Sequence, residues 1–219
     1  MTPAGGRGPL AWQAIVDEGR LPVMLVRHGQ TAWNIERRFL GRADIPLDAD
    51  GIAQAERLAA HIAGVPARAI ATSPLRRARA TADILARGRS LAVEEEPALV
   101  ELDQGELEGK QAEEVLVPHA SFFDAWGADP TDVRVPGGET LRECQARSVA
   151  ALTAIAERHG PGSPVLVVTH QMVIASLVLG ALGRPLGGFR DVKLTNTAVT
   201  VLAYDGRFHV ECVGACDHL

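Results

Sequence analysis

The feature that most constrains the fold of this chain is a series of short apolar runs, each followed by a stretch with helical periodicity. The run at residues 22–27 is continuously apolar rather than alternating, which is typical of a strand buried on both faces. Residues 68–73 are a second strand candidate, and residues 163–170 carry the strongest strand signal of the chain. Strands that alternate with helices favour a parallel sheet covered on both sides. The sequence therefore predicts an α/β fold, a three-layer α/β/α sandwich with a mostly parallel central sheet.

The segments between these strands carry the periodicity of amphipathic helices. The first apolar stripe consists of Ile52, Ala55, Ala59 and Ile62, and the second of Leu75, Ala78, Ala82 and Leu85. Asp48 or Asp50 is a candidate cap for the first helix, and Ser73-Pro74 is typical of the start of the second. A long helix is expected over 140–159. An edge strand near 91–96 and a closing strand pair around Asp205-Gly206 complete the predicted sheet.

The chain is expected to contain one domain. We interpret residues 1–20 as a flexible N-terminal extension that includes a short helix within 12–19, and residues 21–219 as a single domain. Residues 110–138 have weaker periodicity and are rich in Pro, Asp and Gly. This stretch is predicted to be a lid-like insertion over the site that the sheet presents.

Composition excludes several classes of function. Lys and Arg number 22 against 27 Asp and Glu, a net charge of −5, which argues against general nucleic-acid binding. No apolar run approaches the roughly 18 residues of a membrane span, and the N-terminus lacks the apolar core of a secretory signal. The three cysteines form neither a disulfide framework nor a zinc site. We therefore expect a cytoplasmic protein without membrane or nucleic-acid partners.

Three predicted strands end in polar residues that a hydrophobic core does not need. Arg27 and His28 follow the first strand, Ser73 the second, and Thr169 and His170 the third. Ligands of open α/β sheets bind beyond the carboxyl ends of the strands, so these side chains converge if the strands are parallel neighbours. Because unpaired buried cations destabilise a fold, the convergence predicts a site for an anion such as a phosphoryl group.

The segment after the second strand adds positive charge to this site. Arg76, Arg77 and Arg79 lie at a predicted helix start, where backbone N–H groups and the helix dipole already favour an anion. For Arg76 and Arg79, solvated charges on a helix face are the simpler interpretation, and Arg77 is retained as the candidate site residue.

Five motifs carry a resemblance to a known family. The chain resembles the histidine phosphatase superfamily, in its phosphoglycerate-mutase-like branch, from about residue 22 to the closing CDHL. The motifs are LVRHGQTAWN (25–34), TSPLRRARATA (72–82), LVELDQGELEG (99–109), PGGETL (136–141) and VLVVTHQMVI (165–174). Their order and spacing together make the resemblance specific.

The resemblance implies a role for each matching residue. His28 is the nucleophile that becomes phosphohistidine, and Glu101 protonates the leaving oxygen and later activates water. Arg27, Arg77 and His170 hold the phosphoryl oxygens. The predicted substrate-binding residues are Gly29, Thr31 and Asn34 of the first motif, together with Gln171 beside His170. A histidine nucleophile must be neutral, which neighbouring guanidinium groups favour, and the same cations remove the need for a metal or other cofactor.

Several of these assignments have simpler alternatives. Asn34 is also suited to capping a turn, and His170 to a core histidine bonded to a carbonyl oxygen. The choice of Glu101 depends mainly on the family pattern, since Glu94, Glu95, Glu96, Glu106 and Glu108 compete with it. The remaining histidines receive no catalytic role, and His218 is the least secure of these exclusions.

Two positions depart from the family pattern. Gln171 stands where glycine usually follows the second histidine, so it either narrows the pocket or donates a hydrogen bond to the substrate. Leu107 replaces the aromatic residue that is usual in the third motif. The departure at Gln171 bears on the size of the substrate rather than on phosphoryl chemistry.

The predicted function is a metal-independent phosphomonoesterase that acts on a small phosphorylated metabolite through phospho-His28. The first alternative is a phosphoglycerate mutase, which residues 105–135 disfavour because they offer only Lys110 and Arg134 as bases. The second is a non-catalytic phosphate-binding module, which would need neither the nucleophile nor Glu101. The sequence predicts neither the leaving group nor the oligomeric state.

Overall fold

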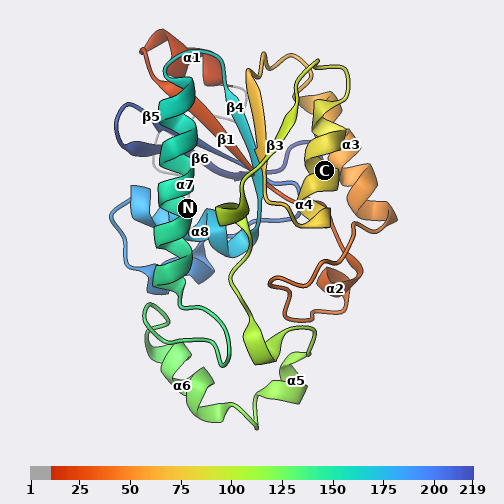
Figure 1. Cartoon of the computed structure of the whole chain (residues 1–219), viewed down its shortest axis with the longest axis vertical. Coiled ribbons are helices and arrows are strands. Elements are labelled where there is room, and N and C mark those ends of the chain that lie inside the picture. Colours follow the sequence, from red (N-terminus) through yellow and green to blue (C-terminus); the bar gives the residue numbers. More distant parts are fainter. Residues whose placement is uncertain (1–10) are drawn as a thin grey trace.

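The computed structural model describes residues 11–219, which fold around one six-stranded sheet (Figure 1). The strand order is β3-β2-β4-β1-β5-β6. Four strands are parallel to one another: β1 (Leu21–Arg27), β2 (Ala69–Thr72), β3 (Val93–Glu95) and β4 (Val165–Thr169). The hairpin of β5 (Val199–Tyr204) and β6 (Phe208–Ala215) completes the sheet: β5 pairs antiparallel with β1, and β6 pairs antiparallel with β5. The predicted α/β fold with a mostly parallel sheet is confirmed.

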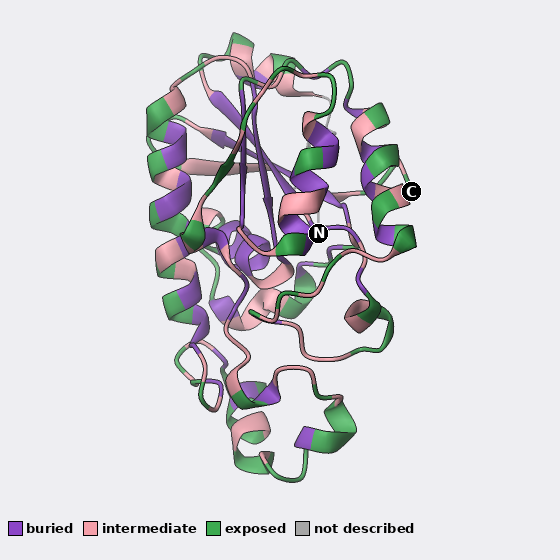
Figure 2. Cartoon of the chain, turned by 45° about the vertical axis from the view of Figure 1, so that its right-hand side comes forward, coloured by how far each residue is buried: buried purple, intermediate pink, exposed green. Residues whose placement is uncertain are grey.

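Helices cover both faces of the sheet because the side chains of β1 alternate between two cores. Val23 and Leu25 pack with α7 (Leu141–His159) and α8 (Gln171–Ala181). Met24 and Val26 pack on the opposite face. The helices on that face are α1 (Trp12–Asp17), α3 (Ala49–His61) and α4 (Arg76–Ala86). Figure 2 shows the buried strands between helices that are buried on one side and exposed on the other.

The register of the parallel strands brings three strand ends to one edge of the sheet. Arg27 pairs with Thr169, and Thr72 pairs with Val168. The N–H group of His28 donates to the carbonyl oxygen of Thr169 at 3.0 Å, which continues the ladder one residue beyond β1. The three strands that end in polar residues, β1, β4 and β2, are therefore parallel neighbours in this order, as the convergence of their ends requires.

Short helices lie beyond this edge. The α-helices are α2 (Ala32–Ile35), α5 (Ala112–Val115) and α6 (Ala120–Ala128), and the 3-10 helices are η1 (Pro97–Leu99), η2 (Gly105–Leu107) and η3 (Leu186–Asp191). Figure 1 shows α5 and α6 at the bottom of the molecule, away from the sheet and past the carboxyl end of β1. These two helices belong to residues 110–138, so the predicted insertion has the position that a lid requires. Its action as a lid, and the single domain at 21–219, stay predictions.

One local expectation is met and two need correction. Residues 1–10 of the predicted extension lie outside the described residues, and the short helix predicted within 12–19 is α1, whose Ile15 is only 1% exposed. The cap of α4 is Leu75, so this helix begins after Ser73-Pro74. Ile52 of α3 is 42% exposed, and the buried face of that helix uses Leu58 instead. Within residues 11–219, no helix is both long enough and apolar enough to cross a bilayer.

Candidate active site

His28 lies directly after β1 and is 3% exposed. Its Nδ1 atom is 2.7 Å from the carbonyl oxygen of Gly29, and a carbonyl oxygen only accepts, so Nδ1 carries the proton. In the neutral ring this leaves a lone pair on Nε2. Burial, and then the charges of Arg77 and Arg27, lower the pKa of His28 well below its ordinary value. His28 is therefore a neutral imidazole with a free Nε2 atom at neutral pH.

Gly29 fixes this ring through its backbone. Its N–H donates to Thr81 Oγ1 at 3.0 Å, so the group predicted to bind substrate already has a partner. A Cβ atom at residue 29 would lie 2.4 Å from the carbonyl oxygen of Gly51, so only glycine allows α3 to approach this turn so closely. The contacts of Gly29 therefore position His28.

Thr31 and Asn34 form the start of α2. Asn34 N–H donates to Thr31 Oγ1, and Asn34 Oδ1 accepts from the N–H of Thr31 at 3.1 Å, which is a capping box. Thr31 is fully buried. The turn-cap interpretation of Asn34 is therefore realised, and the substrate-binding roles of both residues stay predictions.

Arg27 and Arg77 place two guanidinium groups beside His28. Arg27 Nη1 donates to Leu194 O at 2.6 Å, and Arg77 is fully buried with its Nη2 bonded to Gly41 O at 2.6 Å. Burial lowers the pKa of each arginine to about 10, so both remain charged at neutral pH. The Nε atoms of both side chains are buried and have no hydrogen-bond partner within the described chain. Buried donors of this kind are suited to an anion.

His170 faces His28 from the end of β4, and the two ring centroids are 5.2 Å apart. Its Nε2 atom is 2.8 Å from Ser73 Oγ, and that oxygen also accepts the N–H of Leu75. If the Ser73 hydroxyl donates to Nε2, the proton of the neutral His170 ring lies on Nδ1, which is buried and has no partner within residues 11–219. Burial, and then Arg77, lower the pKa of His170 well below its ordinary value.

Glu101 is 5% exposed and lies on the loop after η1. Its Oε1 accepts the N–H of Leu102 at 2.8 Å, and its Oε2 accepts the N–H of Met172 at 3.2 Å. Burial raises the pKa of the Glu101 carboxyl above its ordinary value, although these two bonds and the charges of Arg77 and Arg27 act in the opposite direction. Its environment therefore favours the protonated form, as a general acid requires.

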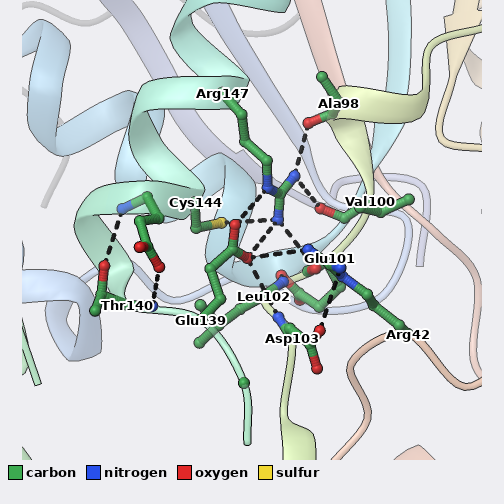
Figure 3. A network of polar contacts seen from close by, with 12 residues as sticks. Arg42, Ala98, Val100, Glu101, Leu102, Asp103, Glu139, Thr140, Cys144 and Arg147 are labelled. Carbon is green, nitrogen blue, oxygen red and sulfur yellow. Dashed lines mark hydrogen bonds and ion pairs between the residues drawn. The ribbon is translucent and has the colours of Figure 1, made fainter. Parts of the chain in front are cut away.

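A polar network holds the loop of Glu101 in place (Figure 3). Arg147 of α7 donates to the carbonyl oxygens of Ala98, Val100 and Glu101, at 2.6, 2.7 and 3.0 Å. The same guanidinium group pairs with Glu139 at 2.8 Å, and Glu139 also contacts Arg42 at 3.6 Å. The network ties the third motif, the fourth motif and α7 together.

Gln171 follows His170 in sequence, but the hollow that it lines includes none of the other predicted site residues. That hollow measures about 450 Å³, and Gln171 shares it with Lys193 and Thr195. Leu194 lies in the same wall and accepts the hydrogen bond from Arg27. Gln171 is therefore placed beside the cluster of His28, Arg27, Arg77, His170 and Glu101, and its role in substrate binding stays a prediction.

Sequence reasoning placed Ser73 at this edge without a role, and it missed Asn196 and Thr197, which also contact the cluster. Ser73 binds His170, Asn196 Nδ2 donates to the carbonyl oxygen of His28 at 3.0 Å, and the N–H of Thr197 donates to the carbonyl oxygen of Arg27 at 3.0 Å. Thr197 also contacts His218 Nε2 through its hydroxyl at 2.9 Å. The only signal was the polar run Thr195–Thr197 before an apolar strand, which by itself is typical of any loop.

The arginines set aside in the sequence analysis point to the surface. Arg79 pairs with Asp83 and Glu95, at 2.9 and 2.8 Å, and Arg76 is exposed. The cluster itself combines a neutral imidazole with a free Nε2, two charged arginines with unpartnered Nε atoms, and a carboxyl whose pKa burial raises. Such a set can bind a phosphoryl group and transfer it between an oxygen and a nitrogen.

Comparisons with known proteins agree with this chemistry. Residues 23–214 match the family described as "Histidine phosphatase superfamily (branch 1)". The sequence is 35% identical over 205 residues to a protein of Cronobacter sakazakii (strain ATCC BAA-894) named "Probable phosphoglycerate mutase GpmB", covering 91% of this chain and 95% of that protein.

Solved structures show the same fold. "Bacillus stearothermophilus YhfR" superposes with a TM-score of 0.85 at 34% identity, covering 90% of this chain and 98% of that one. A phosphoserine phosphatase from Entamoeba histolytica in complex with 3-phosphoglyceric acid gives 0.79 at 25% identity, covering 91% and 99%. The chain therefore belongs to the histidine phosphatase superfamily, branch 1, and is an enzyme of the phosphatase type.

Proposed function

We propose that this chain is a metal-independent phosphomonoesterase that hydrolyses a small phosphorylated metabolite through a phosphohistidine on His28. The observation that carries the proposal is the short contact between His28 Nδ1 and Gly29 O, 2.7 Å, in a ring that burial and two arginines keep neutral. A neutral imidazole with its proton fixed on Nδ1 has Nε2 available as a nucleophile.

The phosphoryl group binds between the two arginines and His170. The unpartnered Nε–H groups of Arg27 and Arg77 and the Nδ1–H of His170 donate to its oxygens. Charge spreads over these oxygens in the transition state, and the two guanidinium groups stabilise it there, which is the part that a metal ion plays in other phosphoryl-transfer enzymes. Turnover that persists after dialysis against a chelator is the expected result.

The reaction proceeds in two displacements. In the first, a bond forms between His28 Nε2 and phosphorus, the bond from phosphorus to the leaving oxygen breaks, and Glu101 gives its proton to that oxygen. In the second, Glu101 takes a proton from water as the water oxygen attacks phosphorus, and the bond to Nε2 breaks. The products are an alcohol and inorganic phosphate, and both His28 and Glu101 return to their starting states.

The decisive experiment is to trap the intermediate. The enzyme is mixed with a radiolabelled phosphomonoester, quenched in alkali and digested, and the label is assigned to a peptide. Label on the peptide that contains His28, stable in alkali and released by acid, is the expected result. Label on another residue would contradict the proposal.

Variants separate the nucleophile from the fold. His28→Ala is expected to lower kcat by roughly 10⁴-fold or more, with an unchanged circular dichroism spectrum. His209→Ala is the matched control, because His209 lies on the β5–β6 hairpin and pairs with Asp205 at 2.9 Å. A His28→Ala enzyme with the turnover of the control would refute the mechanism.

The second candidate function is a phosphoglycerate mutase, which the name of the Cronobacter relative favours. A mutase returns the phosphoryl group from His28 to the substrate, so it needs basic groups that keep the acidic substrate bound. Arg134, one of the two basic residues at 105–135, is bonded to Gly138 O at 2.9 Å and paired with Glu143. This pairing supports hydrolysis over mutase activity.

An isomerisation assay distinguishes the two functions. 3-Phosphoglycerate is supplied with and without 2,3-bisphosphoglycerate, and both 2-phosphoglycerate and inorganic phosphate are measured. Release of phosphate without isomerisation is expected. Isomerisation that outpaces phosphate release would replace the phosphatase proposal with the mutase.

A further inference from the structure

An apolar cavity of about 330 Å³ lies between the lid and the body of the protein. Five of the residues that line it are aromatic: Phe39, Phe122, Phe123, Trp126 and Phe189. Leu102, Leu107, Val135 and Met172 add aliphatic walls, and among residues 11–219 the polar side chains of the lining are Gln104 and Arg190. This volume and this apolar lining are typical of sites for small ligands.

The five aromatic rings that line the cavity contact one another in a continuous series, which we call the arch. Phe39 contacts Phe123 with ring centroids 6.2 Å apart, and Phe123 contacts Phe122 at 5.0 Å. Phe122 then contacts Trp126 at 5.3 Å, and Trp126 contacts Phe189 of η3 at 6.2 Å. The arch thus runs from the loop after α2, through α6 of the lid, to η3. Ring faces and edges at these separations favour a flat aromatic guest.

The cavity adjoins the proposed general acid. The N–H groups of Leu102 and Met172 hold the carboxylate oxygens of Glu101, and the side chains of the same two residues line the cavity. The leaving oxygen must lie where Glu101 can give it a proton, so the group attached to that oxygen extends into this cavity. The hollow lined by Gln171 and Lys193 lies beside Arg27 and does not adjoin Glu101 in this way.

We propose that the substrates of this enzyme are phosphate monoesters of aromatic alcohols, with the aromatic group bound under the arch of the lid. The inference rests on the proposed function and adds the class of leaving group. A sugar or a glycerate would bury hydroxyl or carboxylate groups against apolar walls that offer few partners, which disfavours binding. Arg190, stacked 4.6 Å above the Phe189 ring, and Gln104 supply the polar contacts that orient the guest.

The test compares phosphate esters whose leaving alcohols are of similar acidity. The kcat/KM values of benzyl phosphate and 2-naphthylmethyl phosphate are measured against that of glycerol 1-phosphate. Both aromatic esters are expected to exceed the glycerol ester by roughly tenfold or more. Equal values, or a preference for the glycerol ester, would overturn this inference while leaving the phosphatase mechanism intact.

Variants in residues 110–138, the predicted lid, test whether the preference for aromatic esters arises at the arch. Trp126→Ala is expected to lower the ratio of the benzyl and glycerol kcat/KM values by about tenfold. Phe122→Leu, which keeps an apolar side chain of similar bulk, tests the arch if Trp126→Ala does not fold. Val117→Ala is the control, because Val117 belongs to the same lid but is 84% exposed. Ratios in both arch variants that equal the ratio of the control would contradict the proposal.

A binding measurement separates this inference from the catalytic proposal. Benzylphosphonate and methylphosphonate cannot be hydrolysed, so calorimetry reports their affinity whether or not any ester is turned over. Tighter binding of benzylphosphonate by about tenfold supports the aromatic cavity even if every ester proves inert, a result that would refute the proposed hydrolysis alone. Equal binding of the two phosphonates refutes the aromatic cavity.

Discussion

At the scale of the residue, the site drives two titratable groups in opposite directions. Burial and two arginines lower the pKa of His28, whereas burial raises the pKa of Glu101. Desolvation favours the neutral form of each, so the site favours an unprotonated imidazole nitrogen and a protonated carboxyl side by side. That combination is what an attack by nitrogen with protonation of a leaving oxygen requires.

The proposed role of Glu101 as the general acid predicts a dependence of the rate on the leaving group. Glu101→Gln removes the proton donor, so kcat for an alkyl phosphate is expected to fall by about 10²–10⁴-fold. An ester such as 4-nitrophenyl phosphate leaves without protonation, and its rate of histidine phosphorylation is expected to change much less. Single-turnover kinetics with the two esters measure this first step directly.

The same variant tests the pH dependence. Only protonated Glu101 is a general acid, so the wild-type rate with the alkyl ester is expected to decline as pH rises through the raised pKa of this carboxyl. The decline should be absent in Glu101→Gln, while any loss of rate at low pH, where His28 gains a proton, should persist. Glu101 is not the general acid if Glu101→Gln lowers the rates with both esters equally, or if the variant keeps the decline in rate at high pH.

The sequence predicted some of these residues from their own properties and others only by resemblance. Arg27, His28 and His170 follow apolar strands, so their position at the edge of the sheet could be foreseen. Glu101 could not be separated from its acidic neighbours by composition. Its burial and its two backbone donors distinguish it, and one of these donors, the N–H of Met172, depends on where α8 begins in the fold.

At the scale of the element, strands were more predictable than the contacts between loops. The polar ends of β1, β2 and β4 lie together because the parallel register fixes their relative height. The prediction that α4 starts at Ser73-Pro74 was wrong. Ser73 is of a residue type that often caps a helix, but its hydroxyl lies 2.8 Å from Nε2 of His170. A local pattern predicts a cap from neighbours in sequence, but the partner of the Ser73 hydroxyl is His170, which lies 97 residues away in the chain.

The attachment of α7 to the loop of Glu101 predicts a large effect of Arg147. Arg147→Met removes three hydrogen bonds to carbonyl oxygens and leaves the carboxylate of Glu139, 11% exposed, without its closest partner. Losing this partly buried ion pair together with three hydrogen bonds is expected to lower the free energy of unfolding by about 3 kcal/mol, as measured by urea titration.

An exposed ion pair of the same helix provides the control. Arg158 pairs with Glu94 at 3.0 Å, and both side chains are more than half exposed. Arg158→Met is therefore expected to change the free energy of unfolding by less than about 1 kcal/mol. If the two variants lose the same stability, Arg147 does not hold the loop of Glu101.

At the scale of the whole molecule, the faces of the sheet stabilise the fold and its carboxyl edge holds the candidate active site. Its faces bury the two cores, and its carboxyl edge collects groups that are costly to bury. Arg77 is the largest fully buried side chain, and it lies at this edge with its Nε unpaired. A buried donor without a partner destabilises the folded protein, and a bound phosphoryl group would supply the missing acceptor. Inorganic phosphate is therefore expected to raise the free energy of unfolding.

The two buried histidines make global stability depend on pH. The pKa of His170 is lowered in the native state, so below its unfolded value of about 6.5 the unfolded chain binds a proton that the native chain does not. Stability contributed by the neutral ring is present above that value and is lost as pH falls. A single histidine that stays neutral in the native state costs about 1.4 kcal/mol between pH 7.5 and 5.5.

His170→Asn measures this contribution. Asparagine does not titrate, so between pH 7.5 and 5.5 the variant is expected to lose about 1.4 kcal/mol less free energy of unfolding than the wild type. The comparison uses urea titrations of both proteins at each pH, and any constant cost of the substitution cancels. Glu101, whose raised pKa acts in the opposite direction, is present in both proteins and cancels in the same way. Parallel losses in the two proteins would mean that His170 is protonated in the native state, where it could not offer Ser73 an unprotonated Nε2.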